Sequence, residues 1–145
     1  MNRTSLSIIA EQGELNGFMT TKWYIDDDLI FTTPDQNSAK QIEIHLDIDL
    51  PCCIKIICSG KNSETDTEIV DGKIIRDKYF RLTSVILGKY PVNIGVLYHD
   101  LIVYQADGQP EKNTPYFHDN GIAVIDFPEQ DALLWHLKHN HFYQW

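Results

Sequence analysis

Five short runs of the chain alternate apolar and polar residues, and the clearest extends from Ile42 to Leu50. Every second residue in that run is Ile or Leu, and the residues between them are acidic or His. A period of two places successive side chains on opposite faces of a β-strand, one facing a core and the other facing water. The pattern therefore predicts a protein built mainly from half-buried strands.

The order of the predicted elements indicates the fold class. Extended stretches are predicted at residues 23–31 as a first strand or hairpin, at 42–50, 53–58, 73–75 after an Asp-Gly turn, and 78–87, at 90–98 in a hairpin with 101–104, and at 121–127. From Asp131 to His139, helix-forming residues with helical apolar spacing predict one short C-terminal helix. We therefore expect an all-β fold, an antiparallel β-sandwich or jelly roll with that helix at its end.

The length and the cysteines limit the organisation of the chain. At 145 residues, 43% of them apolar, residues 1–145 are expected to form a single β-sandwich domain with one core and no need of metals or disulfides. Cys52, Cys53 and Cys58 lie in or beside an apolar stretch, and neighbouring Cys residues on a strand face opposite sides. They are expected to be reduced packing residues.

The charge balance excludes two classes of partner. Twelve basic residues against 21 acidic ones give a net charge of −9, which repels nucleic acid and anionic membrane. The N-terminal apolar stretch is too short and polar for a secretory signal, and no run approaches membrane-spanning length. We expect a soluble protein made in the cytoplasm. An acidic surface suits solubility, cation binding or docking onto a basic protein.

Motifs for catalysis are missing from the sequence. It contains no GxSxG, no P-loop and no GxGxxG, and no spacing singles out a pair of carboxylates. We therefore expect no enzyme activity and no cofactor. The acidic triplet at 26–28 has no calcium-loop pattern and is expected to be a solvated turn.

A histidine cluster near the C-terminus is the candidate metal site. His136 and His139 would share one side of a helix, and His141 could approach from its end, with His118 and Asp119 as further donors. The alternative is that this terminal segment is polar surface.

Aromatic residues in loops and near the termini are the candidate binding residues. Flat rings can stack on a ligand or anchor an interface at low entropic cost. The ligand-binding candidates are Trp23, Tyr24, Tyr116 and Phe117. The interface candidates are Phe142, Tyr143 and Trp145, because an exposed apolar tail needs a surface on which to dock. For Trp23 and Trp135, packing at the ends of the core is the alternative.

The segment from Asp66 to Tyr79, Asn120-Gly121 before an apolar strand, and a Trp near the end carry a family resemblance. With them the chain resembles carbohydrate-binding jelly-roll β-sandwich domains of phage and glycan-processing proteins. The resemblance implies a non-catalytic jelly roll that binds a glycan or helps to build a virion. The expected partners are a glycan or a protein, and self-assembly into a homo-oligomer or virion would use sheet edges and the aromatic C-terminus. Two alternatives stay open: an acidic immunity or inhibitor protein that binds a basic toxin or enzyme, and a small His-dependent metalloenzyme.

Overall fold

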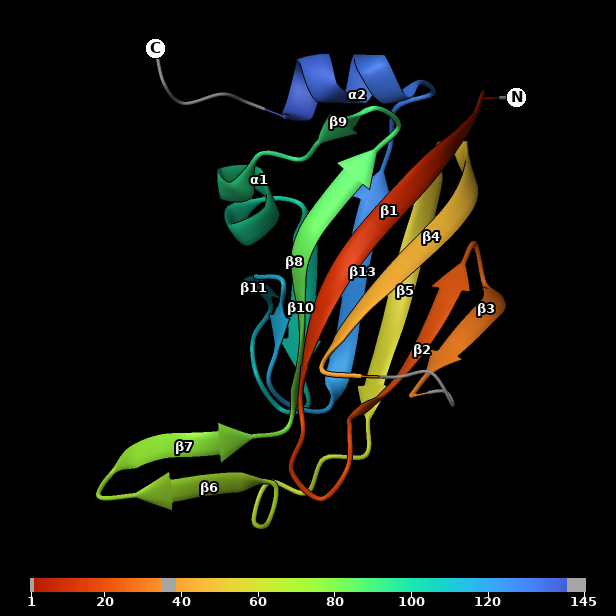
Figure 1. Cartoon of the computed structure of the whole chain (residues 1–145). Coiled ribbons are helices and arrows are strands. Elements are labelled where there is room, and N and C mark those ends of the chain that lie inside the picture. The colour runs from red at the N-terminus through yellow and green to blue at the C-terminus, as the bar shows by residue number, and fades with distance from the viewer. Residues whose placement is uncertain (1, 35–38, 141–145) are drawn as a thin grey trace.

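The computed structural model describes residues 2–34 and 39–140, which form two antiparallel sheets packed face to face (Figure 1). The first sheet has the order β12 (Tyr116–Phe117), β8 (Tyr79–Leu87), β1 (Asn2–Gly13), β4 (Gln41–Leu50), with β9 (Tyr90–Pro91) added on β8. The second sheet has the order β11 (Lys112–Asn113), β10 (Ile102–Ala106), β13 (Gly121–Phe127), β5 (Cys52–Ser59), β2 (Thr20–Ile25), β3 (Asp28–Thr33). The predicted all-β antiparallel sandwich is confirmed.

Strand β1 was not predicted, although it lies in the middle of the first sheet between β4 and β8. Leu6, Ile8 and Ala10 point into the core from this strand. Its pairing with β8 shifts register between Ile9 and Ala10. The extra residue lies on β8 at Thr83, so the burial of β1 alternates without a break. The alternation is hidden in the sequence because the outward-facing Ile9 is apolar and the buried Gln12 is polar.

The prediction of a strand at residues 90–98 is wrong beyond the first two residues, which form β9. Helix α1 (Ile94–His99) takes its place, and the Asn93 side chain caps it by accepting a hydrogen bond from the Gly95 backbone N–H at 2.9 Å. Val96 and Leu97 are both buried, which two neighbouring residues of a strand cannot achieve with one covered face. The predicted hairpin with 101–104 is absent, since β10 pairs with β11 and β13.

The C-terminal helix was predicted at its observed place. Helix α2 (Ala132–His139) begins at the N-cap Asp131, whose carboxylate accepts from the Leu134 backbone N–H at 3.1 Å. Trp135 buries its ring against Phe127, at 5.3 Å between ring centroids. The described residues thus hold two helices rather than one. No helix in this part of the chain combines the length and apolar character required to cross a membrane.

The buried side chains form one continuous cluster between the sheets. Cys52 and Cys58 belong to it, and burial raises the pKa of each thiol to about 12. Cys53 points the other way and is exposed, so the prediction that it packs in the core is wrong. All three cysteines are free.

A separate two-stranded hairpin projects from one end of the sandwich (Figure 1). It consists of β6 (Thr67–Val70) and β7 (Lys73–Asp77), joined by the predicted Asp71-Gly72 turn. Both turn residues have positive φ, 52° and 77°, as a tight two-residue hairpin turn requires. We call this hairpin the arm, and the end of the sandwich from which it projects the arm end.

Candidate functional site

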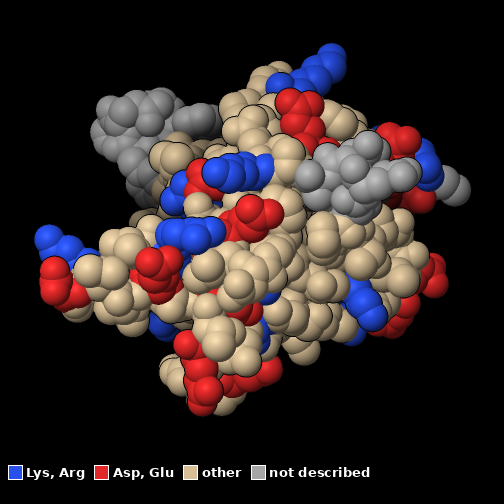
Figure 2. All heavy atoms as spheres, turned by 60° about the horizontal axis from the view of Figure 1, so that its bottom comes forward, with Lys and Arg blue, Asp and Glu red and all other residues tan. Residues whose placement is uncertain are grey.

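Charged and polar side chains gather at the arm end. Figure 2 shows this end turned toward the viewer, with Lys and Arg side chains lying among Asp and Glu side chains. Three segments meet there: the loop after β5, the base of the arm, and the connection from β12 to β13. A cavity of about 350 Å³ opens among them, which we call the Tyr116 cavity. Its lining residues are Lys61, Ser63, Thr67, Ile74, Asp77, Tyr116, His118 and Asp119.

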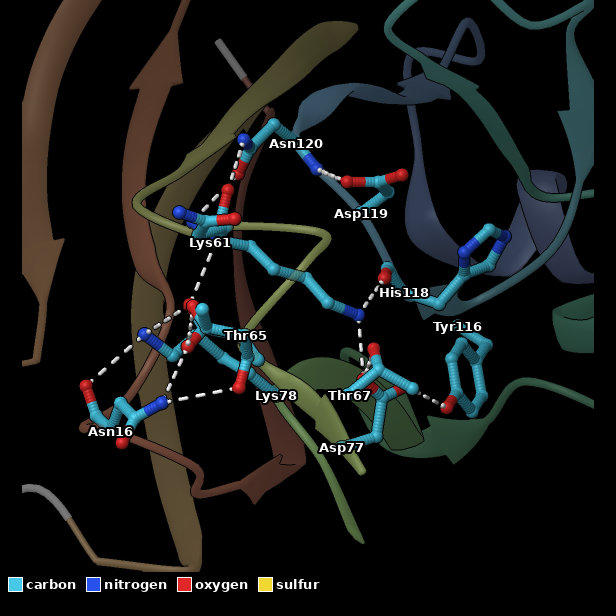
Figure 3. Close-up of polar contacts among 12 residues, drawn as sticks. Asn16, Lys61, Thr65, Thr67, Asp77, Lys78, Tyr116, His118, Asp119 and Asn120 are labelled. Carbon is cyan, nitrogen blue, oxygen red and sulfur yellow. Dashed lines mark hydrogen bonds and ion pairs between the residues drawn. The ribbon is translucent and has the colours of Figure 1, made fainter. Parts of the chain in front are cut away.

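A buried ion pair forms one wall of the Tyr116 cavity (Figure 3). Lys61 Nζ lies 2.7 Å from Asp77 Oδ1, and the two side chains are only 4% and 10% exposed. The same ammonium donates to the His118 carbonyl oxygen. Asp77 also accepts from Thr67 Oγ1 at 2.7 Å and from the Tyr116 hydroxyl at 3.5 Å. Further hydrogen bonds of this kind offset the cost of burying a charge pair.

Asn120 fixes the backbone that carries this lysine. Its side-chain oxygen accepts from the Lys61 backbone N–H at 2.9 Å, and its amide nitrogen donates to the Lys61 carbonyl at 2.8 Å. Asn120 immediately precedes β13, and Lys61 follows β5, the neighbour of β13 in the second sheet. The paired strands therefore bring Lys61 and His118 together.

A second buried ion pair lies beside the first. Lys78 Nζ lies 3.1 Å from Asp66 Oδ2 and donates to the carbonyl oxygens of Asn16 and Gly60, each at 3.2 Å. Asp66 also accepts from the Asn62 backbone N–H at 2.8 Å and from Asn16 Nδ2 at 2.9 Å. The bond from Asn62, followed by those from Asn16 and Lys78, holds the pKa of the Asp66 carboxyl well below its usual range.

Aromatic rings border the cavity beside the first ion pair. Tyr116 stacks on Tyr79 with 5.1 Å between ring centroids and 21° between planes, and His118 lies 5.8 Å from Tyr116. Tyr116 is partly exposed. Partial burial, together with the nearby Asp77 carboxylate, raises the pKa of its hydroxyl, which keeps the ring neutral. The site thus combines an apolar ring face with hydrogen-bonding groups.

The four predicted ligand-binding aromatics lie in different places. Trp23 and Phe117 have no exposed surface: the Trp23 ring stacks on Phe31, and the Phe117 ring lies 5.0 Å from Tyr104. A fully buried ring cannot contact a ligand, so these two are core residues. For Trp23, packing in the core was the stated alternative. Tyr24 is partly exposed on β2, with Lys55 Nζ 5.4 Å from its ring centroid. Of the four, Tyr116 alone lines the Tyr116 cavity.

Both ring nitrogens of His136 form hydrogen bonds within the fold, so its prediction as a metal ligand is wrong. Its Nε2 donates to the Leu87 carbonyl at 2.9 Å, and its Nδ1 accepts from Asn140 Nδ2 at 2.8 Å. The carbonyl can only accept and the amide nitrogen can only donate, so the imidazole is neutral with its proton on Nε2, and neither nitrogen has a lone pair for a metal.

The other predicted metal and interface residues have different outcomes. His139 pairs with Glu129, at 3.0 Å from Nε2 to Oε1, and stacks on Trp135. Within residues 2–34 and 39–140, no three His, Cys, Asp or Glu side chains are grouped to hold a metal ion. The remaining predicted residues, His141, Phe142, Tyr143 and Trp145, lie outside the described residues.

The buried charges were not predicted from the sequence. Lys61 and Asp66 lie in a polar stretch that resembles an exposed loop, yet both are buried. Lys61 pairs with Asp77, and Asp66 pairs with Lys78. Nothing in a run of polar residues distinguishes a solvated lysine from a paired one. The available signal was indirect, since the segment from Asp66 to Tyr79 carries the family resemblance.

No protein-family profile and no curated protein matches the chain. Two solved structures share its fold. One is vCBM60 in its selenomethionine form, described as linking two families of calcium-dependent carbohydrate binding modules, with TM-score 0.53, 11% identity, and coverage of 86% of this chain and 91% of that one. The other is vCBM60 in complex with galactobiose, with TM-score 0.50, 11% identity, and coverage of 85% and 98%. The resemblance to carbohydrate-binding β-sandwich domains is confirmed for the fold.

Proposed function

We propose that the protein is a non-catalytic glycan-binding module and that the Tyr116 cavity is its binding site. One observation carries the proposal: a partly exposed tyrosine, supported from behind by a second stacked tyrosine, borders a cavity otherwise lined mainly by polar side chains. A sugar ring has an apolar face that packs on an aromatic ring and hydroxyl groups that need donors and acceptors. The fold shared with carbohydrate-binding modules supports the same function.

The charges of the cavity indicate the class of glycan. Lys61 and Asp77 neutralise each other, whereas Asp119 forms no ion pair within the described part of the chain. The cavity therefore has a net negative charge, as does the whole chain at −9. Neutral sugars suit this environment, and uronic acids or sulfated sugars are disfavoured by repulsion.

Glycan binding is tested with an array of neutral and acidic oligosaccharides that includes galactobiose as a neutral probe. The native chain should bind neutral members and no acidic ones. Tyr116→Ala should weaken binding about tenfold or more, equivalent to about 1.4 kcal/mol, because it removes the stacking face. Tyr116→Phe keeps the face and should bind within about threefold of the native chain.

Tyr24→Ala is the matched control, because Tyr24 is a partly exposed ring away from the cavity. It should bind like the native chain. Thermal unfolding of each variant separates lost binding from lost folding. A native chain that binds no array member, or equal losses in Tyr24→Ala and Tyr116→Ala, would contradict the proposal.

The arm favours a second function, assembly with further copies of this chain, free in solution or in a virion. Four aliphatic side chains on the arm lie outside the core cluster, and the largest exposures are 60% at Ile69 and 62% at Ile74. A short isolated hairpin is marginally stable in water, and exposed aliphatic groups on it gain stability when a partner covers them.

Light scattering tests assembly. The native chain should form a defined oligomer, and Ile69→Thr with Ile74→Thr should reduce it to monomer while preserving strand propensity. Ile94→Thr, which changes a 67% exposed isoleucine on α1, is the control and should stay oligomeric. A native monomer at high micromolar concentration would argue against assembly. The inhibitor alternative and the single-domain organisation stay predictions.

A further inference from the structure

One of the two structures that share this fold is described as linking two families of calcium-dependent carbohydrate binding modules, and a calcium ion near the proposed glycan site would need suitable ligands in this chain. Ca²⁺ takes about six to eight oxygen ligands at about 2.3–2.6 Å, chiefly from carboxylates and carbonyls. The arm end offers oxygens of these kinds: the carboxylates of Asp66 and Asp77 and the carbonyls of Asn16, Gly60 and His118. These oxygens, however, already contact lysine ammonium groups (Figure 3). Asp77 and His118 contact Lys61, and the other three residues contact Lys78.

The Lys78 ammonium is fully coordinated by oxygens. Its three protons meet three acceptors, namely one Asp66 carboxylate oxygen at 3.1 Å and the carbonyls of Asn16 and Gly60 at 3.2 Å. The side chain is 5% exposed. These contacts connect three segments: the turn before β2, the start of the loop after β5, and the end of that loop before the arm.

The Lys61 ammonium also connects separate segments of the arm end, and it lies closer to the cavity than Lys78 does. It connects the Asp77 carboxylate at the base of the arm with the His118 carbonyl before β13. Unlike Lys78, it lines the Tyr116 cavity. Its two protein acceptors use two of three protons, which leaves one for a hydroxyl group of a bound sugar.

The two carboxylates, each of which offers about four acceptor sites, have little capacity left for a divalent ion. Asp66 uses all four, because it accepts from the Asn62 backbone, Asn16 Nδ2, Thr65 Oγ1 and Lys78 Nζ. The donors to Asp77 are Lys61 Nζ, Thr67 Oγ1 and the Tyr116 hydroxyl. A calcium ion could reach Asp66 or Asp77 Oδ1 only by displacing these donors, and Asp77 Oδ2 keeps a single free acceptor site. Asp119 adds one carboxylate that forms no ion pair in the described part of the chain. Among the residues that the structure describes, however, no three His, Cys, Asp or Glu side chains are grouped to hold a metal ion, so the residues present do not fit calcium.

We infer that the Lys61 and Lys78 ammonium groups are the cations that hold the arm end together, so that the glycan site is assembled without a divalent ion. The part of this inference that concerns glycans rests on the proposed function. The part that concerns calcium and stability does not.

The first experiment needs no glycan. Calcium chloride is titrated into the native, chelator-treated chain in a calorimeter, and the melting temperature is measured with EDTA and with millimolar calcium. We expect no saturable heat and no rise in melting temperature. A saturable heat, or a rise of several degrees, would overturn the inference, because a ligand that binds the folded state raises its stability.

The second experiment removes the ammonium groups one at a time. Lys61→Met and Lys78→Met keep the apolar stem and leave a buried carboxylate unpaired, which should lower the melting temperature by roughly 10 °C. Lys73→Met, on the exposed arm, is the control and should melt like the native chain. Unchanged melting of both buried variants would overturn the inference. If neither variant folds, the calcium titration of the native chain still decides.

The third experiment measures binding of galactobiose and of array-positive neutral glycans in EDTA and in calcium. Equal affinity within about twofold is expected. Binding that requires calcium would overturn the inference. A chain that binds no glycan in either buffer and remains indifferent to calcium would contradict the proposed function and support the ammonium assignment, so the two failures are distinguishable.

Discussion

Asp66 is a short side chain with several partners from distant parts of the chain. It contacts Asn16 from the turn before β2, Asn62 from its own loop, and Lys78 between β7 and β8. Because each partner stabilises the ionised carboxylate, the folded state holds the proton more weakly than the unfolded chain does. The stability of the arm end therefore depends on pH through this residue.

The sign of that dependence follows from the lowered pKa. The stabilisation from Asp66 is fully present above the ordinary Asp pKa of about 4 and is lost as pH falls below it toward the folded-state value. Denaturant unfolding of the native chain between about pH 7 and pH 2 should show this acid loss. Asp66→Asn should be less stable at pH 7 and should lose less stability between about pH 5 and pH 2.

Asp71→Asn is the matched control, since Asp71 lies in the exposed arm turn at a positive φ that Asn tolerates. Its free energy of unfolding should fall with decreasing pH by the same amount as that of the native chain. If Asp66→Asn also lost as much stability at acid pH as the native chain, Asp66 would not be the source of the pH dependence.

At the scale of elements, close backbone contact at the start of β13 positions one side of the candidate site. Gly121 pairs with Ala106 on β10 and with Cys58 on β5, directly after the segment that carries His118 and Asn120. An added Cβ at Gly121 would lie 2.3 Å from the Gln105 carbonyl oxygen and 2.8 Å from the Ala106 Cα. Backbone atoms cannot yield as a side chain can, so this position requires glycine.

Gly121→Ala should therefore destabilise the fold by roughly 1–3 kcal/mol, the usual cost of forced overpacking. Gly108→Ala is the control, because nothing lies within 4 Å of an added Cβ there, although its φ is 75°. It should cost about 1–2 kcal/mol from conformation alone. Urea unfolding measures both, and proton–nitrogen NMR spectra should show shifts at Lys61 and Asn120 in Gly121→Ala only. A Gly121→Ala variant as stable as the native chain would contradict the argument.

At the scale of the molecule, polar networks close both ends of the sandwich. At the arm end the networks are ionic. At the other end, beside the His139–Glu129 pair, His136 and Asn140 connect α2 to the Leu87 and Pro91 carbonyls on β8 and β9. Asn140 also accepts from the Asn93 backbone N–H. The apolar core therefore lies between two hydrogen-bonded ends, each holding segments far apart in sequence.

The sequence was sufficient for the parts of this molecule that depend on local pattern. Strand β4 matches the alternation from Ile42 to Leu50, and α2 matches the helical spacing after Pro128. The segment at 90–98 was misassigned because apolar residues two apart also occur where a capped helical turn buries Val96 and Leu97. Alternation alone does not distinguish these cases in six residues.

The candidate site was predicted only in part. Tyr116 was identified because an aromatic residue in a loop is a local signal. Lys61 was not, since its burial depends on Asp77, sixteen residues away, and on the His118 carbonyl, 57 residues away. Burial of a charged residue is decided by tertiary partners, and one sequence without relatives contains no record of which residues meet.

The arm has a practical consequence. Its base is fixed by buried ion pairs, while its tip, Asp71-Gly72, has no neighbour within 4 Å of an added Gly72 Cβ. Folding of the sandwich core does not use the exposed residues of this hairpin. A foreign peptide inserted between Asp71 and Gly72 would be held away from the body of the protein on a defined stem, which makes the arm a suitable place for an epitope or a fluorescent reporter.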